Sequence, residues 1–126
     1  MHKSRLAGLI IDCDTNDLDA AARFWSRALG APAKSAANLA SSAYVELDMG
    51  SNEPYVEVQK VDHPSRVHID IEADDVAAEV ARLEMHGAKR IADIRGWVVM
   101  EAPTGQRFCV VPVASADFEN KAHTWD

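Results

Sequence analysis

The sequence lacks the features of a membrane protein and of a secreted disulfide protein. Basic residues near the N-terminus are followed by an apolar run that ends at Asp12, which is too short for a membrane span and unlike a secretory signal. The two cysteines, Cys13 and Cys109, have no C-x-x-C spacing and lie in apolar runs, which disfavours a disulfide or a zinc finger. We therefore expect a cytoplasmic protein.

Positive charge and the common catalytic motifs are also scarce. The 13 Lys and Arg residues face 20 Asp and Glu residues, which gives a net charge of -7. Because nucleic acids and anionic membranes bind basic surfaces, neither is an expected partner, and a neutral or cationic small molecule fits better. The sequence has no glycine-rich phosphate loop, no nucleophile elbow and no H-E-x-x-H motif.

What the sequence does contain is an internal repeat. Residues 9–18 return in similar form as residues 67–76, and the same offset continues through the helix pattern that follows. The aligned pairs are Ile11 with Ile69, Asp12 with Asp70, Asp14 with Glu72, Asp17 with Asp75, Ala20 with Ala78, Ala22 with Val80 and Trp25 with Leu83. One copy is too small to bury its own apolar face, so we expect the two copies to form a single domain.

The repeat predicts the order of elements in each half. Residues 1–126 form one domain, with module one at about 6–61, a linker at 62–65, module two at about 66–113 and a tail at 114–126. Apolar alternation and turn residues predict strands at 7–14, 44–48, 55–59, 66–72, 89–93, 97–101 and 106–113.

Helix and loop signals complete this prediction. Thr15 or Asn16 is expected to cap the first helix, which ends at Gly30, and the second helix covers residues 75–86. Residues 31–42 are predicted to form an edge strand and a loop. For the tail two predictions stay open: disorder, or docking of its aromatic residues on the body or on a second subunit.

Several short motifs accompany this order of strand, helix and three strands. They are Asp17-Leu18, Phe24-Trp25 and Leu29-Gly30 in the first half, and Val67-His68-Ile69-Asp70, Asp75-Val76, Gly87-Ala88, Pro103-Thr104-Gly105 and Phe108-Cys109 in the second. In these motifs the chain resembles the vicinal oxygen chelate superfamily, the group of glyoxalase I, bleomycin-resistance proteins and extradiol dioxygenases. The resemblance implies an α+β fold of two tandem βαβββ modules, which pair into an open eight-stranded cup with the helices outside and the ligand inside.

Strand alternation then predicts which side chains line the cup. The residues expected under the helices are Leu9, Ile11 and Cys13 in one module and Val67, Ile69 and Ile71 in the other. The candidate catalytic residues on the opposite face are Asp12, Glu57, His68 and Asp70, and the candidate ligand-binding residues are Tyr44, Glu46, Tyr55, Gln59, Trp97 and Arg107. The structural alternative is that these carboxylates form ion pairs or accept backbone hydrogen bonds, and that Trp97 belongs to the core.

The resemblance also implies four metal-ligand positions, which read Ile10, Glu57, His68 and Cys109 in this chain. Because Ile10 has no donor atom, we expect no chelation through all four positions and no resident cofactor. Glu57, His68 and Cys109 would suit zinc with an open fourth position better than magnesium or manganese. The alternative is a metal-free cup in which Cys109 is a small hydrophobic residue.

Two classes of function follow from the resemblance. The first is a glyoxalase-like lyase or isomerase, with Glu57 or an Asp as base and His68 as acid, base or ligand. Asp12 and Asp70 occupy equivalent places in the repeat, so they either approach each other as an acid–base pair or serve separately as structural residues. The second class is a non-catalytic protein that binds or sequesters a small molecule, as bleomycin-resistance proteins do. A homodimer is expected in either case.

Overall fold

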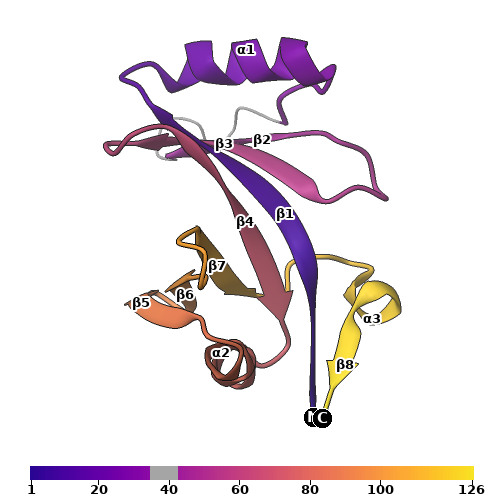
Figure 1. Ribbon diagram of the computed structural model, residues 1–126. Coiled ribbons are helices and arrows are strands. Elements are labelled where there is room, and N and C mark those ends of the chain that lie inside the picture. Colours follow the sequence, from indigo (N-terminus) through magenta and orange to yellow (C-terminus); the bar gives the residue numbers. More distant parts are fainter. Residues whose placement is uncertain (35–42) are drawn as a thin grey trace. The chain divides into compact units, whose positions relative to one another are not determined.

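The structure is a computed structural model that describes residues 1–34 and 43–126. Its strands are β1 (His2–Asp14), β2 (Tyr44–Leu47), β3 (Tyr55–Val61), β4 (Arg66–Ala73), β5 (Lys89–Ile94), β6 (Trp97–Glu101), β7 (Arg107–Pro112) and β8 (His123–Trp125). Its helices are α1 (Leu18–Leu29), α2 (Val76–Met85) and α3 (Phe118–Lys121) (Figure 1). None of these helices is long and apolar enough to cross a bilayer. The predicted edge strand and loop at 31–42 fall mostly outside the described residues.

The eight described strands are hydrogen-bonded in the order β2-β3-β1-β4-β7-β6-β5, and β8 pairs with β1. The pairs β1–β3 and β4–β7 are parallel, whereas the hairpins β2–β3, β5–β6 and β6–β7 are antiparallel. The predicted α+β class is therefore confirmed, as are the seven strands predicted outside residues 31–42. The first strand is longer than expected, because it begins at His2 rather than at residue 7.

Two compact units divide these elements. The α1 unit comprises residues 8–67, and the α2 unit comprises residues 1–7 and 68–126. In the first, α1 packs against β2 and β3; in the second, α2 packs against β5, β6 and β7 (Figure 1). Each unit thus has its own helix on one face of its own strands.

The apolar core of the α1 unit lies between α1 and its strands. Its buried members are Ile11, Cys13, Ala31, Leu47, Val56 and Val58, with Leu18, Ala21, Trp25 and Met49 packed against them. Ile11 and Cys13 are two residues apart and share one face of β1, so their predicted placement under the helix is confirmed. Leu9 shares their parity but is 37% exposed.

The core of the α2 unit is built in the same way but is shifted along β4. Its buried members are Ala73, Val80, Val98, Met100, Phe108 and Val110, with Ile71, Val76, Leu83, Ala88 and Ala102 packed against them. The prediction that Val67 and Ile69 lie under the helix is wrong, since these side chains are 58% and 39% exposed. The helix packs on strands β5, β6 and β7.

The repeat is visible in how the two long helices begin. The Asp17 carboxylate accepts a hydrogen bond from the Ala20 amide, and the Asp75 carboxylate accepts one from the Ala78 amide, each at 3.0 Å. Each aspartate therefore satisfies one of the free amides of the first turn. The expectation that Thr15 or Asn16 caps α1 is wrong, because Asp17 holds that position.

Both helices also end near a glycine, as predicted. Gly30 has φ of 68° and caps α1 in the left-handed conformation, and Gly87 has φ of 101° just after α2. A residue with a side chain adopts this backbone conformation only with strain. The helix ends are therefore fixed by the same residue type in both halves of the repeat.

The tail docks on the α2 unit of its own chain. The buried Glu72 carboxylate accepts hydrogen bonds from the Ala114 and Ser115 amides at 2.9 and 3.1 Å, and Phe118 is 3% exposed. Strand β8 pairs with the start of β1, which places the two chain ends side by side (Figure 1). Of the predictions for the tail, docking on the body is confirmed.

Candidate functional site

The α1 unit gathers polar side chains on the sheet face opposite its core. In the strand register Glu46 lies beside Glu57, and Gln59 lies beside both Tyr44 and Asp12. Because residues two apart on a strand share a face, these side chains and Tyr55 form one polar surface. The sequence prediction therefore placed six residues on a common face of this unit.

Asp12 and Glu46 each lie near a cationic side chain. Asp12 is 2% exposed, and its Oδ2 lies 3.6 Å from Nε of Arg66. Glu46 accepts a hydrogen bond from Nζ of Lys34 at 2.9 Å, and this contact raises the pKa of the lysine. Both contacts support the structural alternative, in which these carboxylates form ion pairs.

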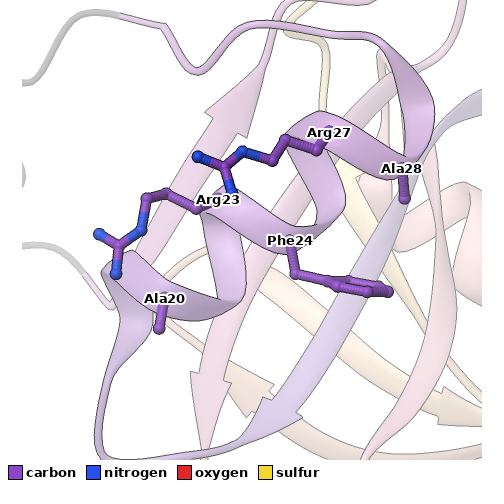
Figure 2. A pocket seen from close by; sticks show the side chains of 5 residues that line it. All are labelled: Ala20, Arg23, Phe24, Arg27 and Ala28. Atoms are coloured by element: carbon purple, nitrogen blue, oxygen red, sulfur yellow. The ribbon is translucent and has the colours of Figure 1, made fainter.

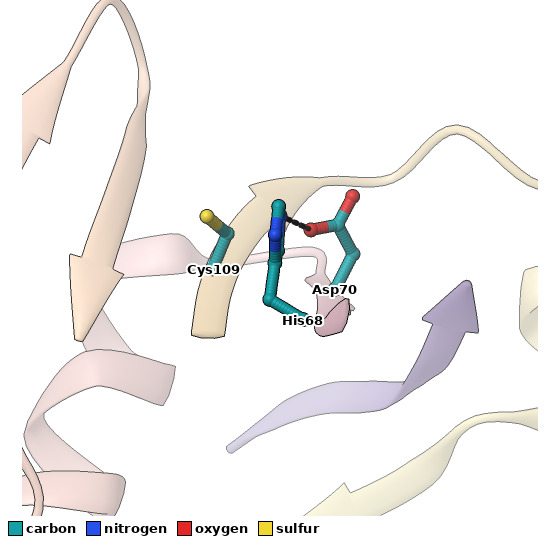
Figure 3. A group of neighbouring side chains, drawn as sticks. All are labelled: His68, Asp70 and Cys109. Atoms are coloured by element: carbon teal, nitrogen blue, oxygen red, sulfur yellow. Dashed lines mark ion pairs between the residues drawn. The ribbon is translucent and has the colours of Figure 1, made fainter. Parts of the chain in front are cut away.

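The polar face of the α2 unit brings together three side chains of different chemistry. Asp70 lies beside Cys109 in the parallel register of β4 and β7, and His68 precedes Asp70 by two residues on the same face. The His68 Nε2 atom lies 3.7 Å from Asp70 Oδ1, and their side chains are 13% and 10% exposed. One ligand atom from each of the three residues lies within 4.8 Å of the other two (Figure 3).

The two cysteines have different environments. Cys13 belongs to the apolar core of the α1 unit, where burial raises the pKa of its thiol. Cys109 lies between Phe108 and Val110, but those two side chains face the core and Cys109 alternates to the polar face. The alternative that Cys109 is a core hydrophobic residue therefore loses its main support.

Two further predicted residues lie on strands β6 and β7. Arg107 Nε donates a hydrogen bond to Glu101 Oε2 at 3.1 Å, so its charge is paired across the hairpin. Trp97 is 36% exposed and is not a member of the apolar core cluster. The prediction that Trp97 could form an aromatic wall for a ligand stays open.

The four metal positions implied by the resemblance do not make a complete ligand set. Ile10 lies beside Glu57 in the register of β1 and β3 and is 3% exposed, so a buried hydrocarbon occupies the first position. Glu57 belongs to the α1 unit, whereas His68 and Cys109 belong to the α2 unit. Within one unit, the donors that converge are His68, Cys109 and Asp70, and Asp70 was not predicted as a ligand.

A buried ion-pair network in the α2 unit was missed by the sequence analysis. Glu79 on α2 is 0% exposed and lies 2.7 Å from Nε2 of His2, while Ser4 donates to it at 2.8 Å. Arg82 donates two hydrogen bonds to the same carboxylate, each at 2.9 Å. Burial by itself would raise the pKa of Glu79, but the hydrogen bonds from Arg82, His2 and Ser4 lower it to about 2.

The C-terminal Trp125 completes this network. Its indole Nε1 donates to Ser4 Oγ at 2.8 Å, and the Arg82 guanidinium lies 3.8 Å from the centre of its ring. A single acidic residue on a helix gives no periodic signal of burial, so its partners could not be found from sequence spacing. The network holds the first and last strands of the chain to α2.

One surface pocket of the α1 unit lies away from the predicted site residues. One pocket of about 440 Å³ is lined by Ala20, Arg23, Phe24, Arg27 and Ala28, and the two arginine side chains extend to the same side of α1 (Figure 2). No predicted site residue lines this pocket. This pocket is therefore not part of the candidate site.

Solved structures with the same fold include two structures of methylmalonyl-CoA epimerase. Methylmalonyl-CoA epimerase in complex with methylmalonyl-CoA and NH4+ has 19% identity and a TM-score of 0.59, covering 92% of this chain and 97% of the other. A variant of Streptomyces coelicolor methylmalonyl-CoA epimerase in complex with 2-nitronate-propionyl-CoA has 17% identity and a TM-score of 0.57, covering 86% and 98%. These similarities establish the fold and leave the reaction open.

A third structure and a family model agree with this assignment. A glyoxalase/bleomycin resistance protein/dioxygenase superfamily member from Vibrio splendidus 12B01 has 17% identity and a TM-score of 0.51, covering 85% of this chain and 98% of the other. No curated protein matches the sequence. The family model of the glyoxalase-like domain matches residues 9–111. The chain therefore belongs to the glyoxalase-like domain family.

Proposed function

We propose that this protein is an isomerase- or lyase-type enzyme that moves a proton on a small oxygenated molecule. The observation that carries the proposal is the grouping of ionisable side chains on the polar sheet face of each unit. In the α1 unit these include Asp12, Glu46 and Glu57; in the α2 unit they include His68 and Asp70. Proton transfer at a carbon atom needs a positioned base and a group that stabilises the developing oxyanion.

Glu57 is the base that we propose. It lies on the central strand of the α1 unit, between Ile10 and Glu46 in the register, and its face is opposite the apolar core. We assign positioning roles to Asp12 and Glu46, which lie near Arg66 and Lys34, respectively.

The acidic character of this face favours a neutral or cationic substrate. The epimerase complexes hold coenzyme A esters, which carry several phosphate charges. The net charge of -7 disfavours such a ligand, even though Arg66 and Lys34 compensate Asp12 and Glu46 on this face. We therefore propose a small hydroxy- or oxo-compound as substrate in place of a coenzyme A ester.

Hydrogen exchange with solvent tests this proposal. The protein is incubated in deuterated water with a panel of α-hydroxyketones and α-hydroxyaldehydes, and with methylmalonyl-CoA, and loss of the C–H proton signal is followed by NMR. Enzyme-dependent exchange in a small carbon acid is expected, and Glu57→Gln should reduce it at least about 100-fold, as loss of a general base does.

The exposed Glu53 provides a control of equal charge, since Glu53→Gln should leave exchange unchanged. Exchange that is equally fast in the Glu57→Gln protein would contradict the assignment of the base. Exchange only in methylmalonyl-CoA would contradict the proposed substrate class.

A binding protein is the second candidate, and the buried Ile10 in the first ligand position favours it. In that case the polar faces would hold a cationic compound without converting it. Calorimetric binding of bleomycin, with no proton exchange in any carbon acid, would support this candidate over the enzyme.

We also propose a cytoplasmic homodimer, as the family resemblance implies. Docking of Phe118 and Trp125 within their own chain removes one reason for expecting a partner. Sedimentation at micromolar concentration tests the dimer directly, and a single monomeric species would contradict it.

A further inference from the structure

We infer that His68, Asp70 and Cys109 form a three-ligand zinc site that lies entirely within the α2 unit. The site differs from the four positions that the superfamily resemblance implies, because it replaces ligands of the first module by Asp70. The three residues supply one nitrogen, one oxygen and one sulfur donor, a set that zinc accepts and that magnesium does not favour.

The backbone explains why these side chains meet. The register of β4 and β7 places Asp70 directly beside Cys109, and the two-residue period of β4 places His68 on the same face. Figure 3 shows the His68 ring between the Cys109 thiol and the Asp70 carboxylate. Donors held by neighbouring strands of one sheet need little rearrangement to close on an ion.

The distances are close to those that a metal requires. In a tetrahedral zinc site with bonds of about 2.0–2.3 Å, ligand atoms lie about 3.3–3.8 Å apart. His68 Nε2 and Asp70 Oδ1 are already 3.7 Å apart, and all three ligand atoms lie within 4.8 Å of one another. An inward movement of about 1 Å or less by the side chains would therefore complete the geometry.

Charge and burial agree with a divalent cation. A neutral His68 with ionised Asp70 and Cys109 carries two negative charges, which equal the charge of zinc. The neighbouring Arg107 does not oppose the ion, because Glu101 pairs with its guanidinium. Three protein ligands leave the fourth position of the metal for water or another oxygen ligand.

Cobalt substitution tests the site without any assay of activity. The reduced, metal-free protein is titrated with Co²⁺ under anaerobic conditions, and the thiolate-to-cobalt charge-transfer band is recorded. We expect one equivalent of cobalt per chain, an intense near-ultraviolet band, and loss of this band when Zn²⁺ displaces the cobalt.

Variants assign the ligands. Cys109→Ser should abolish the band, whereas Cys13→Ala should retain it because Cys13 lies in the core of the α1 unit. Asp70→Asn and His68→Ala should each weaken zinc binding by about 100-fold or more, because loss of even an outer-shell partner costs about 10–100-fold. Circular dichroism establishes that each variant is folded.

Two results would overturn the inference. One is a folded native protein that shows no thiolate–cobalt band at millimolar Co²⁺. The other is a band that survives Cys109→Ser or disappears in a folded Cys13→Ala protein, since the sulfur ligand would then be a different residue. The test does not depend on the proposed reaction, because it measures only the metal.

Discussion

The Nε2 atom of His2 lies 2.7 Å from Oε1 of Glu79, so the beginning of the chain contacts the middle of α2. This contact belongs to a network in which Ser4 and Arg82 also donate to the same buried carboxylate. A fully buried carboxylate is stable in its charged form only when such donors replace water. The association of β1 with α2 should therefore depend on the ionisation of Glu79.

The first prediction concerns the pH dependence of stability. The pKa of Glu79 in the folded protein is about 2, below its ordinary value of 4.5. Its ionised form therefore stabilises the fold above about pH 4.5, and this contribution, on the order of 3 kcal/mol, is lost as the pH falls toward 2. Urea unfolding at pH 7 and pH 3 should show a smaller difference for Glu79→Gln than for the native protein. An equal difference would contradict the assignment.

The second prediction concerns the docked C-terminal strand. Trp125→Ala removes the hydrogen bond to Ser4 and the stacking on Arg82, and should lower the free energy of unfolding by about 2 kcal/mol. Thr124→Ala is the control, since Thr124 is exposed and should change stability by about 0.5 kcal/mol or less. Equal free energies of unfolding for the two variants in chemical denaturation would contradict the proposed stabilisation by the Trp125 side chain.

The third prediction separates the two ends of the core in the α2 unit. Met100 is 0% exposed, so Met100→Ala should cost about 2–5 kcal/mol. Ile69→Ala removes a side chain that is 39% exposed and should cost about 1 kcal/mol or less. A larger loss for Ile69→Ala in thermal or urea unfolding would show that the start of β4 is more covered than the structure indicates.

The fourth prediction concerns a close approach inside the α1 unit. Gly8 lies beside Tyr55 in the register of β1 and β3, and an added Cβ would meet the Tyr55 ring and lie 2.6 Å from its carbonyl oxygen. Gly8→Ala should therefore displace Tyr55 and cost about 1–3 kcal/mol, as overpacking does. Tyrosine fluorescence and urea unfolding measure both effects. Unchanged stability would mean that the two strands separate without cost.

Much of the fold was predictable because the sequence repeats its local signals. The aspartates that cap both helices, the glycines that end them and the alternation in β2 and β3 each depend on neighbouring residues, and such signals survive in a single sequence. The predicted cap of α1 was nevertheless one or two residues too close to the N-terminus, because Thr15, Asn16 and Asp17 are all good cap residues. Only the geometry selects Asp17.

The sequence predicted which face of the sheet each site residue occupies, but not which residues are neighbours across the strands. Strand parity placed His68, Asp70 and Cys109 on one side of the sheet, and the register of β4 with β7 then made Asp70 a neighbour of the thiol. The register of parallel strands depends on tertiary packing and cannot be read from one strand. Gly8 did carry a signal, because a glycine within a strand often marks a close approach.

Strand β4 has an unusual consequence for the mutational tolerance of this protein. Its apolar Val67 and Ile69 are 58% and 39% exposed, whereas its acidic Asp70 and Glu72 are 7% and 0% exposed. Polar residues should be accepted at the first two positions, while an apolar residue in place of Glu72 would leave two tail amides without their acceptor. Variants ranked by hydrophobicity alone would therefore be ranked in the wrong order along this strand.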